Sequence, residues 1–133
     1  MDFVCLDGDQ LWLIEVKDYR RHHRIKVIDL GNEMAHKVRD TLAGLVAASC
    51  NANDAEERRI ARQALRCPRL RVVLHLEQPR NLSKLFSRAV DPDDLRLKLK
   101  QRLKAVDSHP KVVDQFTLGV EVPWTVAGVA RSN

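Results

Sequence analysis

Two acidic residues and a lysine near the start of the sequence have the types and the spacing of a metal-assisted hydrolytic site. The sequence begins MDFVCLDGDQLWLIEVK, in which Asp2 precedes one apolar run while Glu15 and Lys17 end the next. Two carboxylates that lie close together repel each other unless a cation or a proton lies between them. Hard divalent cations such as Mg²⁺ favour such oxygen ligands, and a neighbouring lysine can orient a water molecule. The three residues therefore fit phosphodiester cleavage, provided that the fold brings them together.

A tight β-hairpin is the local structure that places these side chains on one face. The letters DGD between the two apolar runs are turn residues, and the runs themselves are rich in strand-forming residues. A type II′ turn centred on Gly8 and Asp9 pairs Asp2 with Glu15 at the open end of the hairpin. Directly opposed residues share a face, with Cβ atoms about 4.5–5.5 Å apart. The two-residue period of a strand also places Lys17 on that face.

An aspartate followed by Glu15-Val16-Lys17 at the end of an apolar strand resembles the PD-(D/E)XK nuclease superfamily. That superfamily includes restriction endonucleases and archaeal Holliday-junction resolvases. The resemblance covers the hairpin and, more loosely, the helix and strand that follow. It implies a catalytic site of Asp2, Glu15 and Lys17 that hydrolyses DNA. It also implies that Asp2, Glu15 and the backbone carbonyl of Val16 hold Mg²⁺ or Mn²⁺.

The signals after the hairpin predict an α/β (α+β) fold with a mixed central sheet flanked by helices. By the resemblance, this is a restriction-endonuclease-like core that lacks its first helix and strand. Apolar spacing and capping residues predict helices from Gly31 to about Cys50, from Asp54 through Leu65, and from Asp91-Pro92 to about Val106. Alternating apolar residues predict strands at 70–76 and 115–122.

The composition bounds the kind of protein. A chain of 133 residues is long enough for one core but not for two, so we expect a single domain over 1–133. No apolar run approaches a membrane span, and no signal-peptide pattern precedes the first strand. The three cysteines lack metal-type spacing and predict reduced thiols in a cytoplasmic protein. A net charge of +5 favours a polyanionic partner, for which we expect DNA.

Basic and aromatic residues in three places are candidates for contact with a nucleic acid. They follow the hairpin, lie one turn apart in the first helix, or belong to the third helix, which has no acid from 96 to 106. Basic side chains there can meet phosphates, and the tyrosine can stack on a base. Ordinary solvated charge is the alternative in each place. The candidates are Tyr19, Arg20, His36, Arg39, Lys98, Lys100 and Arg102.

The first strand also predicts self-association. Residues 3–6 carry no charge, and an apolar strand at the edge of a sheet invites pairing with another chain. We therefore expect a homodimer through residues 2–6, or a covering segment from the tail 115–130. Two further interpretations remain open beside the nuclease. On the same fold the chain can serve as a non-catalytic nucleic-acid-binding module or as a dimerisation module.

Overall fold

A single four-stranded mixed sheet organises the computed structural model, which describes residues 1–22, 28–79 and 90–127. Its strands, in spatial order, are β1 (Phe3–Asp7), β2 (Gln10–Asp18), β3 (Arg69–Glu77) and β4 (Lys111–Val113). β1 runs antiparallel to β2, and the other neighbouring strands run parallel. The helices are α1 (Leu30–Asn51), α2 (Ala55–Arg66), α3 (Pro92–Arg102) and a 3₁₀ turn, η1 (Leu118–Val120). The predicted α+β class with a mixed, helix-flanked sheet is confirmed.

The N-terminal hairpin forms in the predicted register. Phe3 lies opposite Ile14 and Asp7 lies opposite Gln10, so a two-residue loop joins the strands. Gly8, at the first position of that loop, has φ of 57°. A type II′ turn requires a positive φ there, and glycine adopts it without a steric penalty. The turn chemistry of the sequence therefore sets the register of the whole hairpin.

Two glycine-to-alanine variants should shift stability in opposite directions. Gly8→Ala places a Cβ in the left-handed region and should cost about 1 kcal/mol, although nothing lies within 4 Å of that Cβ. Gly44→Ala lies in α1, also with nothing within 4 Å, and should stabilise by about 0.5–1 kcal/mol. Urea unfolding followed by circular dichroism measures both. Equal shifts of the same sign would contradict the turn assignment.

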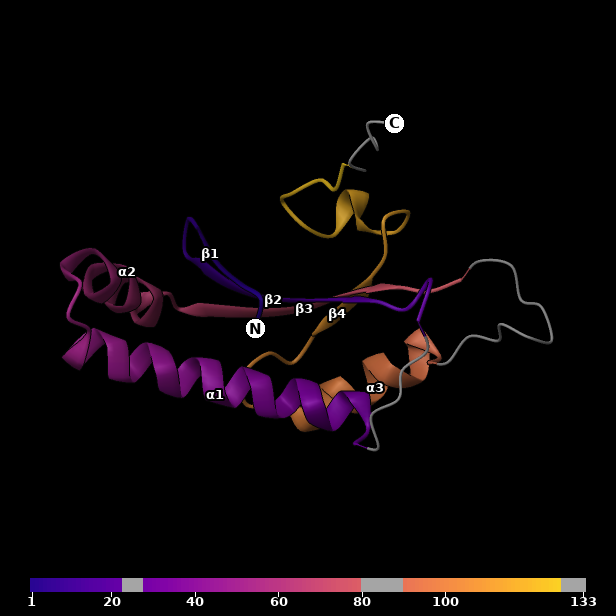
Figure 1. Cartoon of the computed structure of the whole chain (residues 1–133), viewed down its shortest axis with the longest axis horizontal. Helices are drawn as coiled ribbons and strands as arrows, with labels where there is room; N and C mark the ends of the chain where they lie inside the picture. The colour runs from indigo at the N-terminus through magenta and orange to yellow at the C-terminus, as the bar shows by residue number, and fades with distance from the viewer. Residues whose placement is uncertain (23–27, 80–89, 128–133) are drawn as a thin grey trace.

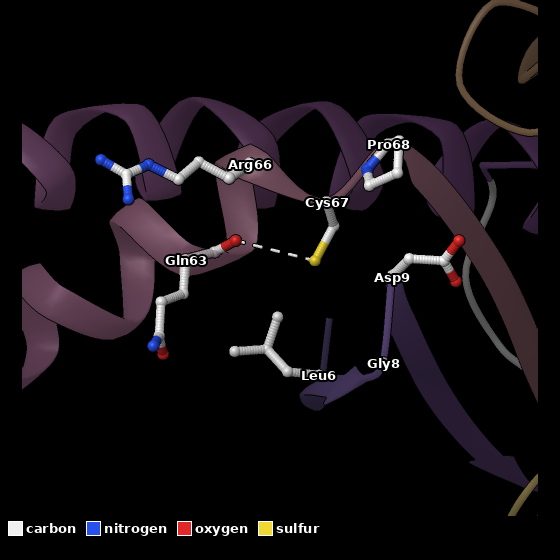
Figure 2. A pocket seen from close by; sticks show the side chains of 7 residues that line it. All are labelled: Leu6, Gly8, Asp9, Gln63, Arg66, Cys67 and Pro68. Atoms are coloured by element: carbon white, nitrogen blue, oxygen red, sulfur yellow. Dashed lines mark hydrogen bonds between the residues drawn. The ribbon is translucent and has the colours of Figure 1, made fainter.

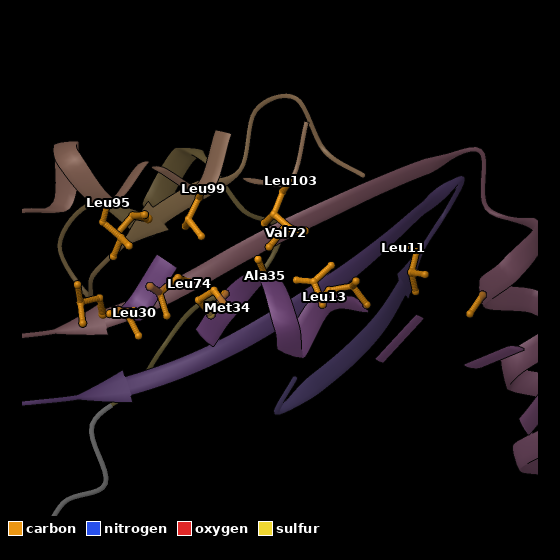
Figure 3. Close-up of a cluster of buried hydrophobic side chains, with 14 residues drawn as sticks. Leu11, Leu13, Leu30, Met34, Ala35, Val72, Leu74, Leu95, Leu99 and Leu103 are labelled. Atoms are coloured by element: carbon orange, nitrogen blue, oxygen red, sulfur yellow. The ribbon is translucent and has the colours of Figure 1, made fainter. Parts of the chain in front are cut away.

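The helices α1 and α3 cover one face of the sheet, and the C-terminal segment with η1 lies over the other (Figure 1). Alternation along β2 separates the two cores. Leu11 and Leu13 enter the larger core under the helices, whereas Trp12 and Ile14 enter the smaller core on the opposite face. Trp124 closes that smaller core by an edge-to-face contact with Trp12, with ring centroids 5.2 Å apart. Figure 3 shows the larger core, where the labelled residues are Leu11, Leu13, Leu30, Met34, Ala35, Val72, Leu74, Leu95, Leu99 and Leu103.

The helices begin where their capping residues predict. The side chains of Asp29, Asp54 and Asp91 each accept a backbone N–H of the first turn that follows. α2 and α3 begin directly after Asp54 and Asp91. The long first helix ends one residue beyond the predicted Cys50. Local capping chemistry therefore locates the starts of α2 and α3, whereas α3 ends at Arg102, before the predicted Val106.

The predicted strand at 115–122 is wrong. That segment contains turns and η1, and the last strand is the shorter β4 before it. Asp114 explains the difference, because its Oδ1 accepts the backbone N–H groups of Phe116 and Thr117, each at 2.9 Å. A side chain that binds backbone donors two and three residues ahead favours a turn over an extended chain.

The cysteines are free thiols, as expected. Cys5 and Cys50 are exposed and Cys67 is half-buried. No helix in the part of the chain that the structure describes is long and apolar enough to cross a membrane.

Candidate functional site

Two of the predicted catalytic residues lie in a cluster of charges between β2 and α1. Glu15, on β2, is fully buried. Its Oε1 accepts a hydrogen bond from Nζ of Lys37 on α1 and lies 2.8 Å from Nζ of Lys17. The same Lys17 Nζ lies 3.3 Å from Oε1 of Glu33, in the first turn of α1. The cluster therefore joins two glutamates and two lysines of β2 and α1.

Lys17 carries a proton in this cluster. Burial acts to lower the pKa of Lys17, but hydrogen bonds and charge attraction from Glu15 and Glu33 outweigh it and raise the pKa above its usual range. An ammonium group donates hydrogen bonds and accepts none. Lys17 can therefore supply positive charge, but it has no lone pair with which to act as a general base at neutral pH.

Asp2 lies at the open end of the hairpin, but its carboxylate binds the backbone. Its Oδ2 accepts the N–H of Val16 at 2.8 Å. Oε1 of Glu15 contacts the ammonium groups of Lys17 and Lys37, whereas Oε2 is buried without a hydrogen-bond partner among the described residues and lies 3.9 Å from the amino group of Met1. Among the described residues, no three His, Cys, Asp or Glu side chains group so as to hold a metal ion. The arrangement thus does not fit a prepared Mg²⁺ or Mn²⁺ site, and the roles given to Asp2, Glu15 and Val16 stay predictions.

The charge cluster joins α1 to the sheet. Lys37 and Glu33 belong to the helix, whereas Glu15 and Lys17 belong to the strand, and the ion pairs cross between them. Removing one member of such a buried pair leaves an uncompensated charge, which is strongly destabilising. The geometry therefore gives this cluster a clear role in fixing the position of α1.

The candidates near the hairpin and on α1 differ in how available they are. Tyr19 is half-buried and packs against the larger core. Arg20 is exposed, but its guanidinium binds both carboxylate oxygens of Asp18, at 2.9 and 2.6 Å. His36 and Arg39 are exposed on α1. The structure therefore leaves the two α1 side chains more available to a ligand than Tyr19 and Arg20.

The three candidates on α3 are exposed, and two of them have no acidic partner among the described residues. Nζ of Lys98 lies 3.0 Å from Oδ2 of Asp29, which precedes α1. Lys100 and Arg102 form no ion pair with any residue that the structure describes. α3 lies on the same side of the sheet as α1 (Figure 1). The last turns of α3 are thus a source of uncompensated positive charge.

A hollow of about 300 Å³, here called the basic hollow, lies beside these residues. Lys111, at its rim, pairs with Glu121 at 3.2 Å, and Arg96 pairs with Asp93 at 3.5 Å. Sequence reasoning missed His109 and Lys111, although both closely follow a strongly basic helix. The residues that line the basic hollow are Arg96, Leu97, Lys100, His109, Pro110, Lys111 and Glu121.

A second hollow, of about 380 Å³, lies between the hairpin turn and the end of α2 (Figure 2). Leu6, Gly8 and Asp9 approach it from the hairpin side. Across from them, Sγ of Cys67 donates to the carbonyl of Gln63 at 3.6 Å. Its lining mixes apolar and polar groups without a convergent set of acids, bases or nucleophiles. We assign no chemistry to it.

The sequence is similar to part of a cysteine--tRNA ligase. The relative, from Neisseria meningitidis serogroup A / serotype 4A (strain DSM 15465 / Z2491), is 39% identical over 112 residues. The match covers 78% of this chain but 16% of the ligase, so the chain spans a small part of that relative's length. No family model matches the sequence, and no solved structure matches it.

This comparison corrects the family assignment. The predicted membership of the PD-(D/E)XK superfamily is wrong, because the relative is a tRNA ligase and not a nuclease. The prediction that the chain is a DNA-hydrolysing nuclease is wrong for the same reason. A pattern of one aspartate and Glu15-Val16-Lys17 is short, and a hairpin whose buried glutamate pairs with lysines produces the same letters. The pattern identified a real charge cluster but not its function.

Proposed function

We propose that the chain is a tRNA-binding module that serves a cysteine--tRNA ligase-type activity by contacting the tRNA backbone. The similarity of 39% over 112 residues to a cysteine--tRNA ligase carries this proposal. A ligase that acts on tRNA has to bind that RNA. The matched length is that of one domain, whereas the ligase is several times longer. A domain that binds RNA while other parts of a larger enzyme carry out the reaction is consistent with a match to 16% of the ligase.

The charges of the described surface support a role in binding RNA. Phosphate contacts supply most of the affinity for a nucleic acid, and lysine and arginine make them. Lys100 and Arg102 are exposed without acidic partners in the described part of the chain, and the basic hollow lies next to Lys100. A folded RNA is recognised largely through its shape and its backbone. α3 and the basic hollow are therefore the proposed RNA surface, in a protein that we place in the cytoplasm with its tRNA.

Changing Lys100 and Arg102 together to glutamine should weaken tRNA binding about tenfold at low salt, because two phosphate contacts are lost. The plot of log affinity against log salt concentration has a negative slope, and that slope should become less steep by about 1.4–1.8, since each lost contact contributes about 0.7–0.9. Fluorescence anisotropy with a labelled cysteine tRNA transcript, titrated over a salt series, measures both quantities.

The matched control is the double variant Arg59→Gln/Arg62→Gln on α2, which lowers the net charge equally. These arginines are engaged locally, with Glu56 and with the backbone carbonyl of Ser49. Equal loss in both double variants would show that net charge and not α3 drives binding. Undetectable tRNA binding at low salt would refute the proposed function. Tighter binding to duplex DNA of equal length than to tRNA would favour DNA as the partner, as the net charge by itself predicts.

A further inference from the structure

β1 is an outer strand of the sheet and has an apolar surface. The strand order begins with β1, so one side of its backbone has no neighbouring strand in the described structure. Phe3, Val4 and Leu6 are 57%, 38% and 41% exposed, and Cys5 is exposed as well. Natural edge strands are commonly short, charged or covered, because an open apolar edge invites pairing. The described C-terminal segment packs over a face of the sheet and leaves this edge uncovered.

The register of the hairpin determines which backbone groups point outward. Asp7 and Gln10 close a two-residue loop, and such a closing pair exchanges its own hydrogen bonds. Bonded and non-bonded pairs alternate, so Cys5 directs its N–H and C=O toward β2. Val4 and Leu6 then direct theirs away from the sheet. The edge therefore offers donors and acceptors at alternate positions, which is the pattern that a further antiparallel strand requires.

We propose that β1 pairs with β1 of a second copy of this chain, antiparallel and centred on Cys5. In this register Val4 of each copy lies opposite Leu6 of the other, and both have outward-facing backbone groups. A shift by one residue would place outward groups opposite inward ones and lose the hydrogen bonds. Centring on Cys5 aligns all five residues of β1, which extends one sheet through both copies. A two-fold axis closes the assembly at the dimer.

A second copy fits this edge because β1 is complementary to itself. Between Asp2 and Asp7 the strand carries no charge, and its side chains are apolar or weakly polar on both faces. On the face away from the helices, Phe3 and Cys5 border an apolar hollow of about 350 Å³ that also includes Trp124. β1 of the second copy would add its own apolar side chains to the lining of this hollow. The proposed RNA surface is not involved, since α3 contacts β4 at the other end of the sheet.

Val4→Lys tests the interface. In a two-fold dimer the substitution is present in both copies, and each lysine lies opposite Leu6 of the other copy. The dissociation constant of the dimer should therefore rise about tenfold or more. Sedimentation equilibrium of the full chain over a concentration series measures it. The matched control is Leu97→Lys on α3, an equally apolar residue that is 60% exposed, and it should leave the dimer unchanged. A wild-type chain that stays monomeric, or a dimer that Val4→Lys does not weaken, would overturn the proposal.

Cys5 tests the register independently. Directly opposed residues of a non-bonded antiparallel pair have Cα atoms about 4.5 Å apart, within the range that a disulfide spans. In a Cys50→Ser/Cys67→Ser background, mild oxidation should link the two Cys5 residues and give a dimer on a non-reducing gel. Adding Cys5→Ser should abolish that band. A dimer in solution that forms no Cys5 cross-link would show that the strands do not pair about this residue.

Discussion

Replacing Glu15 with alanine is expected to lower the free energy of unfolding by about 3 kcal/mol, because it leaves buried positive charge uncompensated. The side chains of Lys17 and Lys37 are 17% and 34% exposed, so water relieves part of the cost. The remaining Glu33 pairs with only one of them in the described structure. Urea unfolding monitored by circular dichroism gives the change.

A matched exposed pair serves as the control. Glu56→Ala removes a carboxylate that pairs with Arg59 at the surface of α2, and it should leave the unfolding midpoint unchanged. The Glu15→Ala effect should also be constant between about pH 6 and 9. Lys17 has a raised pKa when folded, so its contribution is complete below the unfolded pKa of about 10.4 and is lost only as pH rises through the folded pKa. Wild-type stability of Glu15→Ala would show that the cluster does not hold α1.

Replacing Leu99 with alanine is expected to destabilise the chain by about 3 kcal/mol. Leu99 is 0% exposed and lies in the larger core, where α3 packs against the sheet (Figure 3). Truncation removes buried methyl groups and leaves a cavity that a close-packed core fills poorly. Thermal and urea unfolding both report the loss.

The same helix supplies the control. Leu97 is two residues away and 60% exposed, so Leu97→Ala should change stability by less than about 0.5 kcal/mol. Leu99→Ala should bind tRNA less well at temperatures where α3 loosens. Similar stability of the two variants would contradict the packing of α3 on the sheet.

Local features of the fold follow from the sequence by itself. The turn at Gly8 sets the hairpin register, and the capping side chains of Asp54 and Asp91 mark helix starts. Both depend on groups a few residues apart, so the sequence carries all the information. The turn at Asp114 is equally local, because its side chain accepts backbone N–H groups two and three residues ahead. The apolar alternation after Asp114 predicts a strand only if this turn signal is left out.

The role of the charged residues depends on contacts between residues far apart in the sequence, which no local pattern can predict. Glu15 and Lys17 stand out in the sequence, but their partners Lys37 and Glu33 reach them only because α1 folds back over β2. The basic hollow likewise joins Lys100 of α3 to His109 and Lys111 beyond the end of that helix. A carboxylate has the same chemistry as a metal ligand or as an ion-pair partner. Which of the two it becomes is decided by the groups that packing brings within a few ångströms, and only the tertiary structure supplies those.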